Sequence, residues 1–183
     1  MIRLPLILVA LLTIAASCTT ASAVVVLQIG NDLIKGESTV ANRVNWIDIN
    51  SVSLNVSRAI SAPGGGGRQA SVAALSEVAF TKSADIASTR LFLEACGGSP
   101  LGTAKIHFLQ MGGSQTAQLY YEIELSDVMV SSFSTNSNGE RPSENFSLNY
   151  TRIRMRYTKF DGGQATPGEW FGWDREKNLP WNG

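Results

Sequence analysis

Cysteine and histidine are scarce in this chain, and each scarcity excludes a kind of site. The 183 residues include two cysteines, Cys18 and Cys96, and one histidine, His107. A Ser-His-Asp or Cys-His site would have to be built around His107, and no nucleophile motif accompanies it. We therefore interpret His107 as a structural or surface residue and Cys96 as a small buried hydrophobe.

Clustered acidic ligands are missing as well. Metal sites need His, Cys or carboxylate groups at ligand spacing, whereas the acidic residues here are scattered over predicted strands and turns. The sequence thus predicts no metal, no cofactor and no enzyme activity. One hydrolase alternative stays open, because Glu122 and Glu124 share a strand face. A carboxylate pair across neighbouring strands, or His107, would then be the catalytic group.

An excess charge of either sign is absent. Lys and Arg number 15, Asp and Glu also number 15, and the net charge is +0. No cluster of Lys or Arg alternates with aromatic residues, so the chain lacks the electrostatic pattern of nucleic acid binding. We expect no DNA or RNA partner.

An apolar run long enough to cross a membrane is also absent. The N-terminal run covers residues 4–16, whereas a membrane-spanning helix takes roughly 20 residues. With Arg3 before the run and the small-x-small triplet ASA at 21–23 after it, residues 1–23 are typical of a secretory signal. We predict cleavage after Ala23 and a secreted or periplasmic domain of residues 24–183, with no stable membrane insertion.

Three alternatives to this cleaved signal stay open. Residues 1–23 would act as a membrane anchor if they were not cut. Residues 15–18, AASC, form an imperfect lipoprotein cleavage pattern, which would place a lipid on Cys18. A start assigned too far upstream, with the chain beginning at the valines of 24–26, is the third. With residues 1–23 removed, only Cys96 is left and no internal disulfide is possible.

Alternating apolar and polar residues are abundant in the mature chain, and they predict a mainly β fold. The pattern indicates strands over residues 24–29, 44–60, 72–81, 104–111, 115–125 and 127–135. Gly112-Gly113 indicates a hairpin, because such turns need positive φ angles. The inward set of the strand that follows is Leu119, Tyr121, Ile123 and Leu125.

One short helix is predicted within residues 83–98. Its N-cap would be Asp85 or Ser88, and it would end at Gly97. Its apolar face would carry Leu91, Phe92 and Ala95. Because an isolated helix below about 12 to 15 residues is marginal in water, this one must pack against the sheets.

The longest alternating segment is residues 144–157, ENFSLNYTRIRMRY. Its apolar set runs over Phe146, Leu148 and Tyr150, and then slips by one position to Ile153, Met155 and Tyr157, which predicts a β-bulge near Thr151. The opposite face carries Arg152, Arg154 and Arg156. We interpret these arginines as a solvated face paired with acids on an adjacent strand, or alternatively as a ring contact or a basic lumen lining.

Two further segments stand out. The glycine run of residues 64–67, which ends in Arg68, lacks the Lys-Ser/Thr of a phosphate-binding loop, so we interpret it as a flexible hairpin loop that projects. The C-terminal tail holds Trp170, Trp173 and Trp181. A tail this aromatic must dock on a surface, either of its own barrel or of a neighbouring subunit.

The order and spacing of several segments resemble the haemolysin-coregulated protein (Hcp) family, the tube proteins of bacterial type VI secretion systems. The segments are IKGEST (34–39), VNWIDINSVSLNVSR (44–58), GGGGR (64–68), FTKSADIASTRLFLEACGG (80–98), IELSDVMVSSFSTN (123–136), RPSENFSLNYTRIRMRYT (141–158) and GWD (172–174). Each is weak alone, but together in this order they are specific and cover nearly all of the mature chain.

The resemblance implies a compact β-barrel of two antiparallel sheets with one short flanking α-helix. It also implies a structural protein that forms homohexameric rings, which stack into a hollow tube able to carry small effectors. Partners would be other copies of the chain, effectors, and spike and sheath proteins. Ring stacking would fall to the loop that contains Pro63, Gly64, Gly65, Gly66, Gly67 and Arg68, and sheet faces would form the ring wall.

One feature departs from the family pattern. Subunits of an injection tube assemble inside the cell and normally lack a cleaved signal, whereas residues 1–23 here form one. The alternative function is therefore a secreted monomeric β-barrel binding module that kept the Hcp fold without tube assembly.

Overall fold

The computed structural model describes residues 23–61, 67–111 and 117–183. Its largest sheet has eight strands, and all of its pairings are antiparallel. In sheet order these are β16 (Leu179–Pro180), β15 (Phe171–Asp174), β13 (Arg152–Asp161), β10 (Ala117–Ser126), β9 (Ala104–Met111), β1 (Ala23–Ile29) and β2 (Ile47–Ile49), while β14 (Gln164–Pro167) also pairs with β13.

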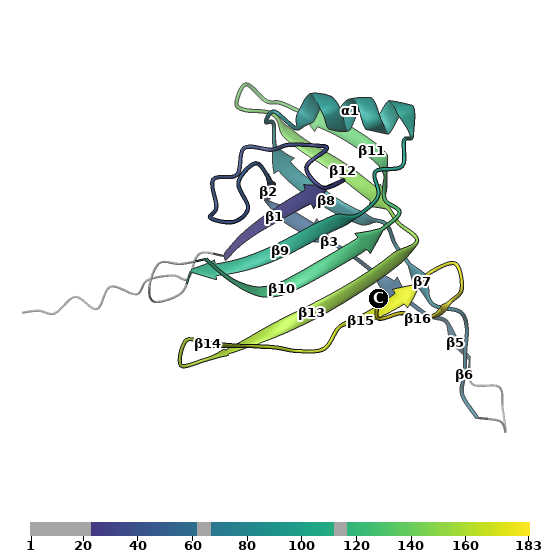
Figure 1. Cartoon of the computed structure of the whole chain (residues 1–183). Helices are drawn as coiled ribbons and strands as arrows, with labels where there is room; N and C mark the ends of the chain where they lie inside the picture. The colour runs from purple at the N-terminus through teal and green to yellow at the C-terminus, as the bar shows by residue number, and fades with distance from the viewer. Residues whose placement is uncertain (1–22, 62–66, 112–116) are drawn as a thin grey trace, which may run out of the picture.

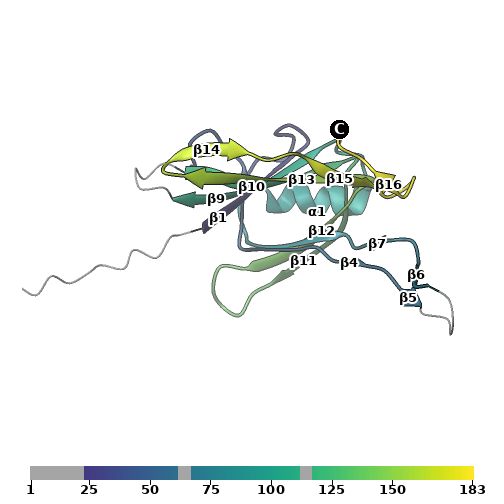
Figure 2. The same ribbon diagram turned by 90° about the horizontal axis from the view of Figure 1, so that it is seen from below.

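A four-stranded antiparallel sheet lies behind the first. Its order is β11 (Met129–Asn136), β12 (Ser143–Asn149), β8 (Val78–Ser83) and β3 (Ser51–Ser53). Two short ribbons, β4 (Val56–Ser57) with β7 (Ala74–Leu75) and β5 (Ile60–Ser61) with β6 (Gln69–Ala70), form an arm that projects from the body (Figure 1). Figure 2 shows the two sheets as separate layers, seen edge-on. The predicted architecture of two antiparallel sheets is confirmed.

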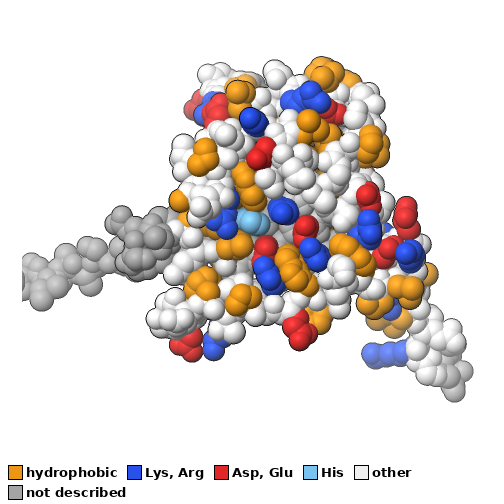
Figure 3. Space-filling model, in the orientation of Figure 1, with side chains coloured by type: hydrophobic (Ala, Val, Ile, Leu, Met, Phe, Trp, Pro, Cys, Tyr) orange, Lys and Arg blue, Asp and Glu red, His pale blue; other side chains and the backbone are white. Residues whose placement is uncertain are grey.

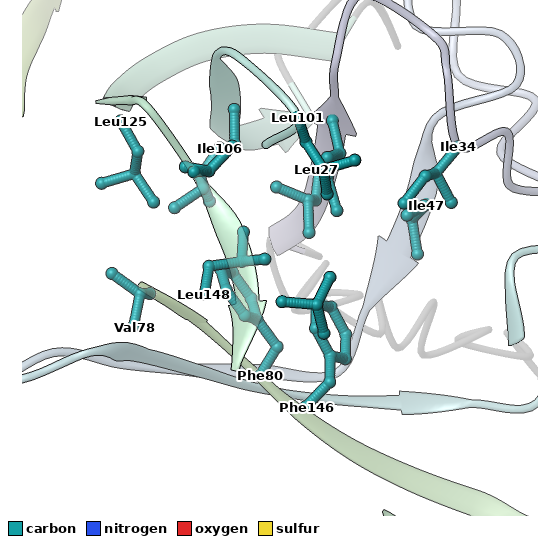
Figure 4. Close-up of a cluster of buried hydrophobic side chains, with 14 of the residues drawn as sticks. Leu27, Ile34, Ile47, Val78, Phe80, Leu101, Ile106, Leu125, Phe146 and Leu148 are labelled. Atoms are coloured by element: carbon teal, nitrogen blue, oxygen red, sulfur yellow. The ribbon is translucent and has the colours of Figure 1, made fainter. Parts of the chain in front are cut away.

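The core fills the space between the two layers. The large sheet contributes Leu27, Ile47, Ile106 and Leu125 and the small sheet contributes Val78, Phe80, Phe146 and Leu148, all of them buried (Figure 4). Phe80 and Phe146 are opposite in register on β8 and β12, and their rings stack with centroids 4.9 Å apart. Burying each side chain of this size contributes about 1.5–3 kcal/mol, so the layers need no disulfide to hold them together.

The structure differs from the prediction of one bulged strand over residues 144–157. These residues form two strands, β12 and β13, which belong to different sheets. The chain turns between the layers at Thr151, whose backbone N–H donates to the Ser126 carbonyl oxygen at 3.1 Å. The one-residue slip in the apolar pattern has this cause, because both strands face the same core. Tyr157 departs from the pattern and is 60% exposed.

The segment at 44–60 is also divided. Instead of one long strand it forms β2, β3, β4 and β5. Asn50 separates β2 in the large sheet from β3 in the small sheet, so the chain again passes from one layer to the other. Beyond β3 the chain leaves the body along the arm, where Val56 is 60% exposed.

The helix α1 (Ser88–Gly97) lies across the top of the body in Figure 1. Gly98 ends it in the left-handed conformation that glycine favours, with φ at 64°. Ala87 stands at the N-cap without a side-chain cap, so the expectation of Asp85 or Ser88 there is wrong. Ser88 instead starts the helix, and its hydroxyl accepts from the Asp85 backbone N–H at 2.9 Å.

The buried face of α1 is narrower than predicted. Leu91 is buried as expected, whereas Phe92 is 57% exposed and Cys96 is exposed, so the interpretation of Cys96 as a buried hydrophobe is wrong. The buried residues of the helix are Leu91 and Glu94, whereas Phe92 makes only an edge contact with Phe133 of β11, with ring centroids 6.2 Å apart.

A buried ion pair fixes the start of α1 to the small sheet. The Lys82 ammonium, fully buried on β8, lies 2.8 Å from Glu144 Oε2 and 2.6 Å from Asp85 Oδ1. Ser88 Oγ donates to the same Glu144 oxygen at 2.8 Å. The charge of Lys82 is therefore compensated by two carboxylates, that of Glu144 on β12 and that of Asp85, which lies just before α1.

The strands β9 and β10 pair as an antiparallel hairpin, as predicted, and the Gly112-Gly113 turn lies outside the described residues. The register shifts between Leu119 and Tyr121. As a result Leu119 joins a second apolar cluster with Trp46, whereas Tyr121, Ile123 and Leu125 pack with the main core. The predicted inward set therefore holds for three of its four members.

Candidate functional site

Charged side chains form two rows on the outward face of the large sheet. Strand register places His107, Glu122 and Arg156 in one row and Lys105, Glu124 and Arg154 in the next, each row crossing β9, β10 and β13. The alternate residues of these strands, such as Ile106, Ile123 and Ile153, point into the core. Figure 3 shows this face from the front, with the histidine near its centre and acidic and basic side chains around it.

Each of the three arginines of β13 pairs with an acid. Arg156 Nε donates to Glu122 Oε1 at 2.6 Å, Arg154 Nε donates to Glu124 Oε2 at 2.8 Å, and Arg152 donates to Asp127 at 2.8 Å. Two of the acids lie on the adjacent strand β10, and Asp127 directly follows it, so this part of the interpretation is confirmed. Hydrogen bonds from the Thr151 hydroxyl and from Arg152 hold the pKa of Asp127 below its usual value.

Tryptophans of the C-terminal tail lie over the same arginines. The guanidinium carbons of Arg154 and Arg156 are each 4.6 Å from the Trp170 ring centroid. Trp181 lies 5.2 Å from Arg152 and 5.5 Å from Arg154. A cation over an indole face gains about 0.5–1 kcal/mol where exposed and more where desolvated. The tail therefore docks on its own barrel, which decides between the two alternatives that the sequence left open.

The single histidine lies among these charged side chains. Arg43 Nε donates to His107 Nδ1 at 3.0 Å, and the imidazole contacts the Trp46 ring in a tilted arrangement, with centroids 4.6 Å apart and an interplanar angle of 48°. Burial first, and then the charges of Arg43, Lys105 and Arg156, lower the pKa of His107 to about 4. The ring is thus neutral at pH 7, and its Nδ1 lone pair is occupied by an arginine rather than directed at a Ser or Cys.

The carboxylates of the hydrolase alternative are engaged in the same way. Glu122 and Glu124 each accept from an arginine, so both serve as partners of a cation on β13. Within residues 23–61, 67–111 and 117–183, no group of three or more His, Cys, Asp or Glu is placed to hold a metal ion. In the same ranges, no helix is long and apolar enough to cross a membrane.

A second surface feature is an open apolar groove of about 440 Å³ beside the arm. One wall comes from the arm, with Val56 and Leu75, and from Leu54 just before it. The other wall comes from Met155, Phe171 and Trp173 of β13 and β15. Val56 is 60% exposed and Phe171 is 66% exposed. Large apolar side chains gathered in an open groove indicate a contact surface.

Only some of the remaining predicted positions are among the residues that the structure describes. Pro63, Gly64, Gly65 and Gly66 lie outside the described residues, as does Cys18. Gly67 and Arg68 are exposed just before β6, at the outer end of the arm. Ala23 is the first residue of β1 and pairs in register with Gln110, so the predicted cleavage would leave the rest of that strand intact.

Sequence reasoning missed Arg43, Trp46 and Lys105 as part of the charged face. No local motif marks Arg43 or Trp46, because the loop before β2 reaches this face only through tertiary packing. Lys105 had a signal, since the alternation that put His107 on a strand also puts Lys105 on the same face, two residues away.

Comparisons with known proteins give a consistent result. Residues 26–157 match the family described as "Type VI secretion system effector, Hcp". "Protein hcp1" of Pseudomonas aeruginosa is 30% identical over 107 residues, which make up 56% of this chain and 65% of that relative. The match therefore spans less than two thirds of the relative's length.

Solved structures show the same fold. One described as "Structure of a type six secretion system protein" superposes with a TM-score of 0.79 at 23% identity, covering 87% of this chain and all of the other. Hcp1 from Salmonella typhimurium gives a TM-score of 0.69 at 20% identity, over 87% of this chain and 99% of the other.

Proposed function

Because the chain belongs to the Hcp family of type VI secretion system proteins, we propose that it is a structural subunit that assembles into homohexameric rings, which stack into a tube. The role is mechanical, and no catalytic step is assigned to any residue. The observation that carries the proposal is the apolar groove between the arm and β13–β15, since exposed apolar side chains gain most when a second copy covers them.

The arm supplies the proposed contact between rings. Its paired strands β4–β7 and β5–β6 extend away from the two-layer body. Ring stacking is assigned to the segment that links β5 to β6 in the sequence, which contains Pro63, Gly64, Gly65, Gly66, Gly67 and Arg68. A glycine-rich segment suits close approach of two backbones, because no Cβ atoms intervene.

The charged face of the large sheet supplies the proposed ring wall. Arg152, Arg154 and Arg156 would line the wall or the lumen as neutralised pairs rather than as free cations, since each has an acid partner. Small effectors in the lumen, and spike and sheath proteins at the ends and outside of the tube, are the proposed partners. We assign no nucleic acid partner.

Export is proposed from the N-terminal sequence. Residues 1–23 would be removed after Ala23, which would release residues 24–183 to the periplasm or the medium, and lipidation of Cys18 would be the alternative.

A second candidate function is a secreted monomeric module with the same fold. It is favoured by the way in which the arginines are satisfied within one chain. Each has an acid partner, and Trp170 and Trp181 cover them from the same subunit. A chain of this kind would leave its charged face free for a ligand.

Native mass spectrometry and electron microscopy of residues 24–183 test both candidates. We expect hexamers and ring-shaped particles. Phe171→Asp places a charge in the groove and should abolish rings without unfolding the monomer, because Phe171 is 66% exposed. Ile86→Asp is the matched control, since Ile86 is 64% exposed but lies just before α1, away from the groove. A strictly monomeric wild type at high concentration would contradict the ring and favour the module.

A further inference from the structure

A polar pocket of about 290 Å³ opens on the charged face. Lys105 and His107 of β9 and Glu124 of β10 contribute to its floor, and Arg154 borders it on β13. Trp46 and Trp170 also line it. Trp46 contacts His107 on β9 and Trp170 lies over Arg154 on β13, so the two indoles are on either side of β10.

The size of the pocket limits its ligand. A volume of about 290 Å³ is at the lower end of the range for ligand sites, which suits a molecule with a single six-membered ring and its substituents. Indole faces favour flat aromatic rings and the C–H faces of sugar rings.

The charge around the pocket is positive. The lining itself is neutral, because Lys105 and Arg154 are balanced by Glu122 and Glu124. Arg43, which donates to His107, and Arg156, which donates to Glu122, adjoin the lining and bring the local charge to +2. His107 adds nothing at pH 7, because its pKa is about 4. The pocket therefore favours an anion.

Lys105 is the cation best able to bind that anion. Arg154 and Arg156 already donate to glutamates, and Arg43 donates to His107. Lys105 forms no ion pair with any carboxylate in the part of the chain that the structure describes. It is partly exposed and lies opposite Glu124 in register, where its ammonium can reach the mouth of the pocket.

We propose that this pocket binds a small monocarboxylate carried on a six-membered ring. The ring would lie between Trp46 and Trp170, and the carboxylate would accept hydrogen bonds from the Lys105 ammonium. An aromatic acid and a sugar acid share this chemistry. The inference needs only one subunit, so it does not rest on the proposed ring.

Titration of the intact chain with four probes tests the proposal. Benzoate and glucuronate are the carboxylates, and benzamide and glucose are their neutral counterparts. Affinity is measured by calorimetry and by the indole N–H signals of Trp46 and Trp170 in ¹H–¹⁵N spectra, at a concentration where native mass spectrometry shows monomers. We expect at least one carboxylate to bind with a Kd near or below about 1 mM, and to move both indole signals. Which of the two binds identifies the ligand class.

Variants of Lys105 separate recognition from folding. Lys105→Gln should weaken binding about tenfold or more, as expected for loss of a charge-assisted hydrogen bond, whereas Lys105→Arg should preserve it. Lys159→Gln is the matched control and should leave the affinity unchanged, because Lys159 lies on the exposed part of β13 beside Asp161. The neutral counterparts should bind at least about tenfold more weakly than the acids.

Three results would overturn the proposal. These are no saturable shift of either indole signal at about 10 mM of either carboxylate, equal affinity for an acid and its neutral counterpart, or unchanged affinity in a folded Lys105→Gln. Ring formation is scored separately by native mass spectrometry. A chain that forms rings but binds neither acid would contradict the pocket alone, and a monomer that binds would contradict the ring alone.

Discussion

The guanidinium of Arg154 lies between two different elements, with its carbon 4.6 Å from the Trp170 ring centroid and its Nε 2.8 Å from Glu124 Oε2. The carboxylate comes from β10 and the indole from the C-terminal tail. One arginine thus connects the centre of the large sheet to the last residues of the chain. This connection explains why a tail rich in tryptophan is ordered on the barrel surface.

Loss of the Trp170 indole should loosen that tail. Trp170→Leu removes the ring over both Arg154 and Arg156, and we expect a loss of about 1–2 kcal/mol in the free energy of unfolding. Trp181→Leu should cost less, because Trp181 is farther from its arginines, at 5.2 and 5.5 Å. Urea denaturation followed by circular dichroism measures both. Equal costs, or no cost for either, would show that the cation–π contacts do not hold the tail.

Gly172 should not tolerate a side chain. A Cβ at this position would lie 2.5 Å from the Ile153 carbonyl oxygen and 2.8 Å from Arg154 Cβ. Gly172→Ala should therefore separate β15 from β13 and expose the tail to proteases. Limited proteolysis with mass spectrometry of the fragments checks this expectation. Gly97→Ala is the control, because a Cβ there would meet only Ser99 Oγ, at 3.7 Å. Identical cleavage patterns for the two variants would contradict the close approach seen at Gly172.

Lys82 should be essential for stability. Lys82→Met leaves Glu144 and Asp85 buried without their shared cation, and breaking a buried pair in this way typically costs about 3–5 kcal/mol. Adding Glu144→Gln and Asp85→Asn should restore part of that loss. Lys159→Met is the exposed control and should change stability by less than about 1 kcal/mol. Urea denaturation midpoints of the wild type, the two single variants and the triple variant measure these changes in stability. A small loss of stability for Lys82→Met would contradict a fully buried charge.

His107 should make stability depend on pH below neutrality. Its pKa is about 4 in the folded chain, lowered first by burial, against about 6.5 when unfolded. The unfolded state therefore binds the extra proton first. The stabilisation is complete above pH 6.5 and is lost as the pH falls from there towards 4, by up to about 1.4 kcal/mol per pH unit.

The comparison that isolates this effect is wild type against His107→Gln at pH 7 and pH 5. This window lies above the range in which Asp127 and Glu77 titrate, because hydrogen bonds lower the pKa of both acids. Wild type should lose more stability than the variant between the two pH values, as measured by urea denaturation. Parallel losses in the two proteins would indicate that His107 is protonated equally easily in both states.

The strand positions were predictable because period-two alternation reports burial directly. Residues 23–29, 104–111 and 129–136 appear as strands where alternation or β-rich composition indicated them. What alternation does not report is which sheet a strand joins. The slip at Thr151 has the same sequence pattern whether the strand bulges or turns into the other layer, and only the pairing partners distinguish the two.

The wrong predictions of which α1 residues are buried have a related origin, because local sequence does not show which other elements a helix contacts. The spacing of apolar residues predicted the helix and its end at glycine, but it did not predict how little of the helix touches the body. Phe92 and Cys96 have apolar side chains that the local sequence assigns to a core. The buried stripe instead includes Glu94, which pairs with Arg90 at 2.6 Å.

The sequence by itself determined the family resemblance, the mainly β architecture, the hairpin of β9 and β10, and the shared face of Arg152, Arg154 and Arg156, because these follow from local order and periodicity. Only the tertiary structure decided that acids from β10 neutralise those arginines and that tryptophans from the tail cover them. It also decided that Trp46 and Lys105 complete a pocket beside them. Such contacts join residues that are far apart in the chain, and their register and distance are set by the folding of two sheets around one core.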